Sequence, residues 1–134
     1  MMLFSKNEEL NCWETNTVFR GRIIRLAINN CYQESEHLTI ARTTLEKIDR
    51  AWLDIEENIV RSLHESYNQN WVDPDKGFPQ LDTQQFLEKI IFQGVEINNN
   101  SLSLYFADSQ LFGGHYVDIF WDCDSKMHKA TLIG

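Results

Sequence analysis

The sequence predicts an α+β fold: an N-terminal β-hairpin, one long and one short helix, and a C-terminal antiparallel meander, with the helices packed on one face of the sheet. Three observations support this prediction. Apolar and polar residues alternate near the N-terminus, apolar residues then repeat at steps of three and four, and alternation returns toward the C-terminus. With 134 residues, of which 43% are hydrophobic and 12% aromatic, the chain is expected to form a single domain over residues 1–134.

The N-terminal hairpin is predicted from two stretches of strand character. They span Cys12 to Phe19 and Arg22 to Ile28, and Gly21 between them suits a turn or bulge. Every other residue from Ile24 to Ile28 is a large aliphatic, so one side of this strand is expected to face the core. The polar run from Gln33 to His37 is expected to form a loop.

The long helix is predicted from the strongest periodic signal in the chain. Large apolar residues repeat at steps of three and four from Leu45 to Leu63, which indicates a helix from about Thr44 to about Asn68. Thr43 with Glu46 three residues later fits a capping box at its start, although apolar residues before Thr43 allow an earlier beginning. Pro74 lies in the turn region that ends the helix.

The short helix and the meander follow. Asp82 with Gln85 suggests a second helix cap, and the amphipathic run after it predicts a helix that reaches Ile91. Asn98-Asn99-Asn100 is expected to be a tight hairpin turn. The strands expected in this region are Gly94 to Ile97, Ser101 to Ala107, Tyr116 to Trp121 and His128 to Ile133.

The charge balance narrows the classes of partner. The chain carries 20 Asp and Glu residues against 12 Lys and Arg, a formal net charge of −8. Nucleic-acid binding is disfavoured, because phosphate contacts require a concentration of basic residues, and a basic protein partner is favoured instead. No apolar run is as long as a membrane span and no signal-peptide core begins the chain, so we expect a cytoplasmic protein with no membrane contact.

No metal or other cofactor is expected. The three cysteines are far apart and form no CxxC pair, which disfavours a disulfide framework and a zinc site. The turn after the strand ending at Trp121 offers potential zinc ligands, but without the compact spacing of a zinc motif. These potential ligands are Asp122, Cys123, Asp124 and His128.

Several motifs resemble one known family. Leu111-Phe112-Gly113-Gly114-His115 follows an acidic turn and precedes the predicted strand Tyr116 to Trp121 and a closing run from Ala130 to Gly134. Asn70-Trp71 and the segment Leu81 to Phe86 are similar as well. From about residue 21 onward, the chain therefore resembles the uncharacterised bacterial family called domain of unknown function 2262. The resemblance implies a fold and a bacterial origin, and it brings no established activity.

His115 is the candidate general base. It follows Gly113 and Gly114 and lies between Asp108 and Asp118 in the sequence. In a catalytic interpretation, one of these two carboxylates would orient the imidazole, although no serine or cysteine sits in a nucleophile elbow. In a structural interpretation, the glycines supply a turn and His115 forms a hydrogen bond to the loop backbone.

Two acidic groups are candidate partner-binding surfaces. One is the polar side of the long helix, and the other surrounds Trp121 near the last turn, where an aromatic anchor with charges around it is typical of a binding hot spot. Alternatively, Trp121 packs within the sheet. The residues expected to contact a partner are Asp54, Glu57, Asp118, Trp121, Asp122 and Asp124.

Two functions remain open from the sequence. The first is an acidic protein-binding module, most concretely an immunity-type protein that neutralises a basic bacterial toxin by occluding its active site. The second is a small hydrolase that uses His115 with Asp108 or Asp118. The first requires no cofactor and no catalytic motif.

Overall fold

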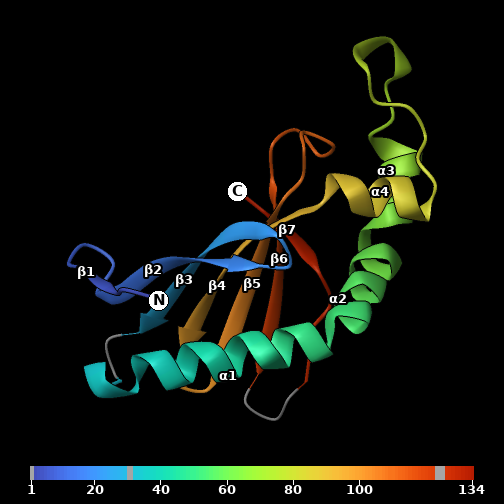
Figure 1. The fold of residues 1–134 in the computed structure, drawn as a ribbon. Helices are drawn as coiled ribbons and strands as arrows, with labels where there is room; N and C mark the ends of the chain where they lie inside the picture. The colour runs from blue at the N-terminus through green and yellow to red at the C-terminus, as the bar shows by residue number, and fades with distance from the viewer. Residues whose placement is uncertain (1, 30–31, 123–125) are drawn as a thin grey trace.

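The computed structural model describes residues 2–29, 32–122 and 126–134 and confirms the α+β class (Figure 1). The strands are β1 (Ser5–Asn7), β2 (Cys12–Phe19), β3 (Arg22–Asn29), β4 (Ile91–Asn98), β5 (Ser101–Ala107), β6 (Tyr116–Asp122) and β7 (Thr131–Ile133). The α-helices are α1 (His37–Arg50), α2 (Trp52–Ile59), α3 (Glu65–Asn70) and α4 (Thr83–Lys89). Shorter turns are the 3-10 segments η1 (Glu34–Glu36) and η3 (Pro74–Lys76) and the π-helical turn η2 (Val60–His64).

The described strands form one seven-stranded sheet whose spatial order equals the sequence order, β1 to β7. Neighbouring strands are antiparallel, except that β3 and β4 are parallel because the chain passes through all the helices between them. The predicted hairpin and meander are therefore two antiparallel units that lie side by side. Strand β1, which the sequence did not indicate, pairs with the start of β2.

The long helix begins earlier than its proposed cap. Thr43 lies inside α1, and the helix starts at His37, where a loop was predicted. The buried positions of α1 are His37, Ala41, Thr44 and Ile48, all in one helical phase. Because His37 and Thr44 are polar, the apolar periodicity did not indicate that these positions are buried. The capping-box prediction at Thr43 was wrong for that reason.

The helical segment is also interrupted. Ala51 separates α1 from α2, and η2 separates α2 from α3. The buried residues Ile59, Leu63 and Tyr67 are spaced by four, which exceeds the α-helical repeat of about 3.6 residues. A π turn adds a residue to one turn and so keeps Leu63 and Tyr67 on the buried side.

The second cap prediction is confirmed. Asp82 Oδ1 accepts a hydrogen bond from the Gln85 N–H at 2.8 Å, and Gln85 Oε1 accepts one from the Asp82 N–H at 3.0 Å. Helix α4 ends at Lys89, before the predicted limit, because the chain enters β4 at Ile91. Strand β4 is longer than predicted, with a register shift between Phe92 and Gly94.

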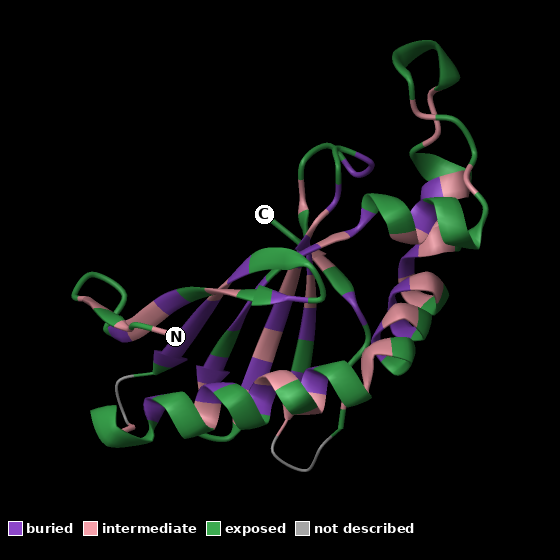
Figure 2. Ribbon diagram, in the orientation of Figure 1, coloured by how far each residue is buried: buried purple, intermediate pink, exposed green. Residues whose placement is uncertain are grey.

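The helices cover one face of the sheet. Leu26 of β3, Leu104 of β5 and Ile119 of β6 are fully buried on this face and belong to the same hydrophobic cluster as Ile48 and Ile55 of the helices. Figure 2 shows this burial on the strands behind α1, while the segment between α3 and α4 projects outward and is mostly exposed. Within the described residues, no helix combines the length and apolar content needed to cross a membrane.

Candidate functional site

The opposite face of the sheet, here called the open face, carries polar side chains in register. Arg25 of β3 is paired with Gly94 of β4, Gly94 with Tyr105 of β5, and Tyr105 with Asp118 of β6. These residues therefore form one row across four strands. Since side chains alternate between the faces of a strand, this row follows directly from the burial of the intervening apolar residues on the helical face.

Gly94 allows the Tyr105 ring to cross the sheet. A Cβ atom on residue 94 would lie 2.5 Å from the Tyr105 hydroxyl oxygen and nearer still to the Arg25 carbonyl oxygen, so no larger residue fits without displacement. The ring passes over the space that a side chain would fill, and the Tyr105 hydroxyl accepts a hydrogen bond from Arg25 Nη1 at 3.2 Å. The glycine thus fixes the position of an aromatic side chain on the open face.

Arg25 is held by acidic and phenolic partners. Its Nε donates to Glu14 Oε2 at 2.9 Å, and its Nη2 donates to the same oxygen. Burial alone would lower the pKa of Arg25, but the hydrogen bonds to Tyr105 and Glu14 outweigh it and raise the pKa above its ordinary value. Glu96 is more distant, with Oε1 at 3.8 Å from Arg25 Nη1. The guanidinium is therefore committed mainly to Glu14.

Asp118 has no such partner. Among the described residues, none donates a hydrogen bond to its carboxylate or forms an ion pair with it. Partial burial raises the pKa of Asp118 above its usual value of 3.8, and the negative charge of Glu96 raises it further. The face therefore holds two carboxylates whose charges are poorly compensated.

These groups line a hollow, the open-face pocket, with a volume of about 460 Å³. It is large enough for a side chain or a small ligand, and its walls combine charged, phenolic and aliphatic groups. Its lining residues are Arg25, Gln93, Glu96, Ser103, Tyr105, Tyr116, Asp118 and Ile133.

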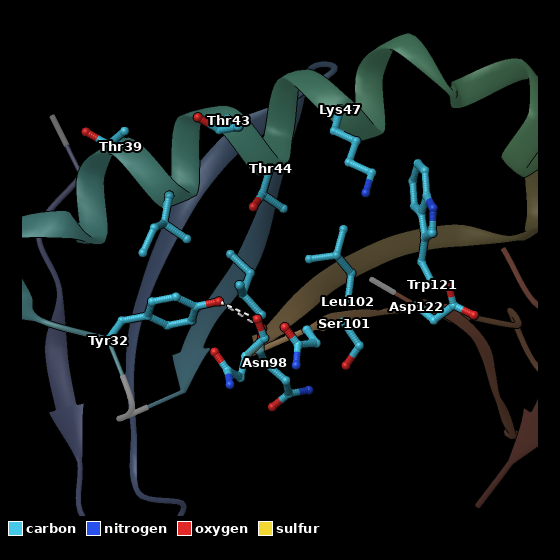
Figure 3. A pocket seen from close by; sticks show the side chains of 14 residues that line it. Tyr32, Thr39, Thr43, Thr44, Lys47, Asn98, Ser101, Leu102, Trp121 and Asp122 are labelled. Carbon is cyan, nitrogen blue, oxygen red and sulfur yellow. Dashed lines mark hydrogen bonds between the residues drawn. The ribbon is translucent and has the colours of Figure 1, made fainter. Parts of the chain in front are cut away.

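A second pocket, of about 360 Å³, lies between α1 and the turn that joins β4 to β5 (Figure 3). In it, Lys47 extends from α1 and its ammonium group lies 4.5 Å from the centroid of the Trp121 ring. The Tyr32 hydroxyl lies within hydrogen-bonding distance of the Asn98 and Asn99 carbonyl oxygens, at 3.1 and 3.0 Å. Trp121 is buried on the helical side of the sheet, so the structure separates it from Asp118.

The other predicted partner-binding residues are distributed over different surfaces. Asp122 Oδ1 accepts a hydrogen bond from the Lys126 N–H at 3.1 Å, and its Oδ2 lies 3.0 Å from His128 Nε2, so Asp122 holds the connection to β7. Asp54 and Glu57 are exposed on α2, in the helical layer. Asp124 lies outside the described residues.

Of the potential zinc ligands in this connection, Cys123 and Asp124 lie outside the described residues. In the rest of the chain, as far as the structure describes it, no group of three or more His, Cys, Asp or Glu side chains is arranged to hold a metal ion.

Asp108 organises the loop before β6. Its buried carboxylate accepts four backbone hydrogen bonds of 2.9 to 3.1 Å. Along this loop, Ser109 and Gln110 adopt positive φ angles of 50° and 68°, which are unfavourable for residues with a Cβ atom. The carboxylate therefore stabilises a strained backbone. The donors are the N–H groups of Gln110, Phe112, Gly114 and His115.

The His115 ring contacts the backbone of this loop. Nδ1 forms a short hydrogen bond with the Phe112 carbonyl oxygen, and the ring lies edge-on to Trp71, with 6.2 Å between centroids. No carboxylate in the described part of the chain lies within hydrogen-bonding distance of the imidazole. The structure thus brings Asp108 to the His115 backbone and places Asp118 on the open face.

Sequence reasoning missed most of the open-face pocket. Alternation within β3 and β5 is compatible with Arg25 and Tyr105 lying on the side opposite the aliphatic residues, but the sequence does not show that these strands are close in space. Gly94 inside a strand pattern was a usable signal, because such a glycine often marks the close approach of another group.

Fold and site together define a small α+β protein whose mostly antiparallel sheet is covered by helices on one face and carries a polar pocket on the other. The chain belongs to the family described as "Uncharacterized protein conserved in bacteria (DUF2262)", which matches residues 2–132. The resemblance noted in the sequence is therefore confirmed. No curated protein and no solved structure matches the chain.

Proposed function

We propose that the protein is a binding module that recognises a basic protein partner through the open face of its sheet. In its most concrete form, it is an immunity-type protein that neutralises a basic bacterial toxin by occluding the toxin's active site. The observation that carries this proposal is the composition of the open face, where apolar side chains are exposed around poorly compensated carboxylates.

The apolar part lies at one end of the open face. Val18 of β2 pairs with Ile23 of β3, and their exposed fractions are 68% and 75%. Tyr116 of β6 pairs with Ile133 of β7, and both are also exposed. A face that exposes several large apolar side chains is typical of an interaction surface, because their burial by a partner contributes favourable free energy.

The charged part gives the surface its preference for a cation. Glu96 and Asp118 lie beside the apolar groups, and the whole chain carries a formal net charge of −8. A negative potential of this kind accelerates encounter with a basic protein and aligns the two surfaces. The association rate is therefore expected to fall steeply as salt is added, with a smaller change in the dissociation rate.

The hydrolase alternative gains no supporting observation. Its proposed orienting carboxylate, Asp108, is engaged by backbone N–H groups, and Asp118 belongs to the open face. The imidazole of His115 has its Nδ1 atom bonded to the Phe112 carbonyl oxygen. The binding proposal accounts for more of the exposed chemistry.

The test compares partner capture by three forms of the protein in a bacterium that produces it. One is unchanged, one carries Ile23→Lys with Tyr116→Lys on the open face, and one carries Asp54→Asn with Glu57→Gln on α2. All the substituted residues are exposed, so the fold is expected to persist, which circular dichroism checks.

The proposal expects the unchanged and α2-substituted forms to capture the same basic protein and the open-face form to lose it. Co-expression with the captured protein then tests neutralisation, because an immunity protein restores growth. Capture of the same partner by all three forms would refute binding through the open face.

A further inference from the structure

We infer that the open-face pocket accepts one arginine side chain of the partner and holds its guanidinium between the carboxylates of Glu96 and Asp118. The source of this arginine, a basic protein, rests on the proposed function. The geometry of the pocket does not depend on that function.

The charge balance around the pocket favours an added cation. Its lining includes one cation, Arg25, and two carboxylates, Glu96 and Asp118. Arg25 is already bonded to Glu14 through two of its nitrogens and to the Tyr105 hydroxyl through a third. Among the described residues, Glu96 has only the 3.8 Å ion pair with Arg25 Nη1, and Asp118 has no ion pair or hydrogen bond. Both carboxylates can therefore accept hydrogen bonds from an added cation.

The walls of the pocket suit a guanidinium in shape and chemistry. Tyr105 and Tyr116 provide aromatic surface beside the carboxylates, and Ile133 adds an aliphatic contact. A guanidinium is planar and weakly hydrated, so it can stack on a tyrosine ring while its N–H groups donate to carboxylates. A volume of about 460 Å³ accommodates such a side chain.

The aromatic wall of the pocket is preorganised. The Tyr105 ring is fixed in place by the absence of a side chain at Gly94 and by its hydrogen bond with Arg25. A binding group that is already positioned loses little conformational entropy when the ligand arrives. The aromatic wall is therefore present before the partner binds.

The raised pKa of Asp118 supports the same geometry. Burial and the charge of Glu96 both disfavour its ionised form, and a bound guanidinium would favour that form. The titratable and charged groups that face Asp118 are Glu96 on β4, Tyr105 on β5 and Arg25 on β3, with Tyr116 on its own strand. A proton thus competes with the cation, and binding is expected to tighten as the pH rises through the Asp118 pKa.

The experiment is a titration followed by amide chemical shifts in a 15N-labelled sample. The ligand is N-acetyl-arginine amide, and the matched ligand is N-acetyl-citrulline amide, which has nearly the same shape without the charge. Ionic strength is kept constant. The protein is studied unchanged, with Glu96→Gln plus Asp118→Asn, and with the control pair Glu46→Gln plus Asp75→Asn, two exposed carboxylates that do not line the pocket.

The inference expects the arginine ligand to shift the amide signals of Gly94, Tyr105 and Asp118 in the unchanged and control proteins. Loss of both pocket carboxylates should weaken binding by about tenfold or more, since hydrogen-bonded charge pairs are removed. Equal shifts with citrulline, or arginine binding that survives the double substitution, would overturn it. If the double variant does not fold, Asp118→Asn alone is compared in the same way.

The outcomes separate this inference from the proposed function. If the open-face substitutions abolish partner capture but the arginine ligand does not bind the pocket, the function stands and the inference fails. If the arginine ligand binds as described but no basic protein is captured, the pocket stands and the proposed function fails.

Discussion

Replacing Asp108 by asparagine tests the role of the loop carboxylate in the fold. Three of its four backbone hydrogen bonds reach Oδ2 and one reaches Oδ1. An asparagine can keep its oxygen at only one of these positions. In the better orientation it preserves three bonds, and its amide NH2 group faces the N–H of Gln110.

The cost follows from these contacts. One opposed and unpaired donor costs about 1–3 kcal/mol, and the three remaining bonds lose the strengthening that a charged acceptor gives. We expect Asp108→Asn to lower the free energy of unfolding by about 3 kcal/mol, which corresponds to a melting temperature roughly 10 °C lower for a domain of this size. Urea denaturation followed by circular dichroism measures the free energy, and calorimetry measures the temperature.

Asp118→Asn is the matched control, since it makes the same chemical change at a carboxylate that accepts no hydrogen bond from the described residues. Its cost is expected to stay below about 0.5 kcal/mol, because the native environment already disfavours the ionised form of Asp118. If Asp108→Asn costs less than about 1 kcal/mol, or no more than the control, the carboxylate does not hold the loop as we argue.

Three further predictions concern other parts of the fold. Gly94→Ala forces a Cβ atom against the Tyr105 hydroxyl, so thermal unfolding should show a loss of about 2–3 kcal/mol. Asn58 is buried, and its side-chain amide donates a hydrogen bond to the His128 carbonyl oxygen at 2.8 Å. Asn58→Ala should therefore lower the free energy of unfolding, measured by urea denaturation, by about 2–4 kcal/mol. A loss under about 0.5 kcal/mol would contradict this role. The folded-state pKa of Asp118 lies above its unfolded value, so the folded protein binds this proton more tightly. The unchanged protein should therefore gain stability relative to Asp118→Asn as the pH falls through that raised pKa toward 3.8, and a constant difference between the two proteins across this window would oppose the assignment.

The local parts of the fold could be predicted from sequence because their signals are local. Strands β2 and β5 have the predicted bounds, and the cap at Asp82 is confirmed, since alternation and capping depend on residues that are near one another in the chain. The start of α1 was missed because polar residues such as His37 occupy buried positions, where burial is decided by tertiary packing.

The candidate site was harder to predict, because it combines residues from four strands. Asp118 was selected from its neighbours in sequence, whereas its neighbours in space are Glu96 and Tyr105. The parallel pairing of β3 with β4 brings Arg25 to this place, and no periodicity within either strand specifies that pairing. The acidic composition led to the proposal of a basic partner and specified no surface for it.

The parallel pair at the centre of the sheet has a consequence for how the chain folds. Asn29 and Asn98, whose side chains meet at the ends of β3 and β4, are 69 positions apart. Bringing such distant segments together requires loop closure before any contact is gained, so joining the two half-sheets is expected to limit the folding rate. Until they join, each half exposes an unpaired strand edge, and newly made chains are then most vulnerable to aggregation.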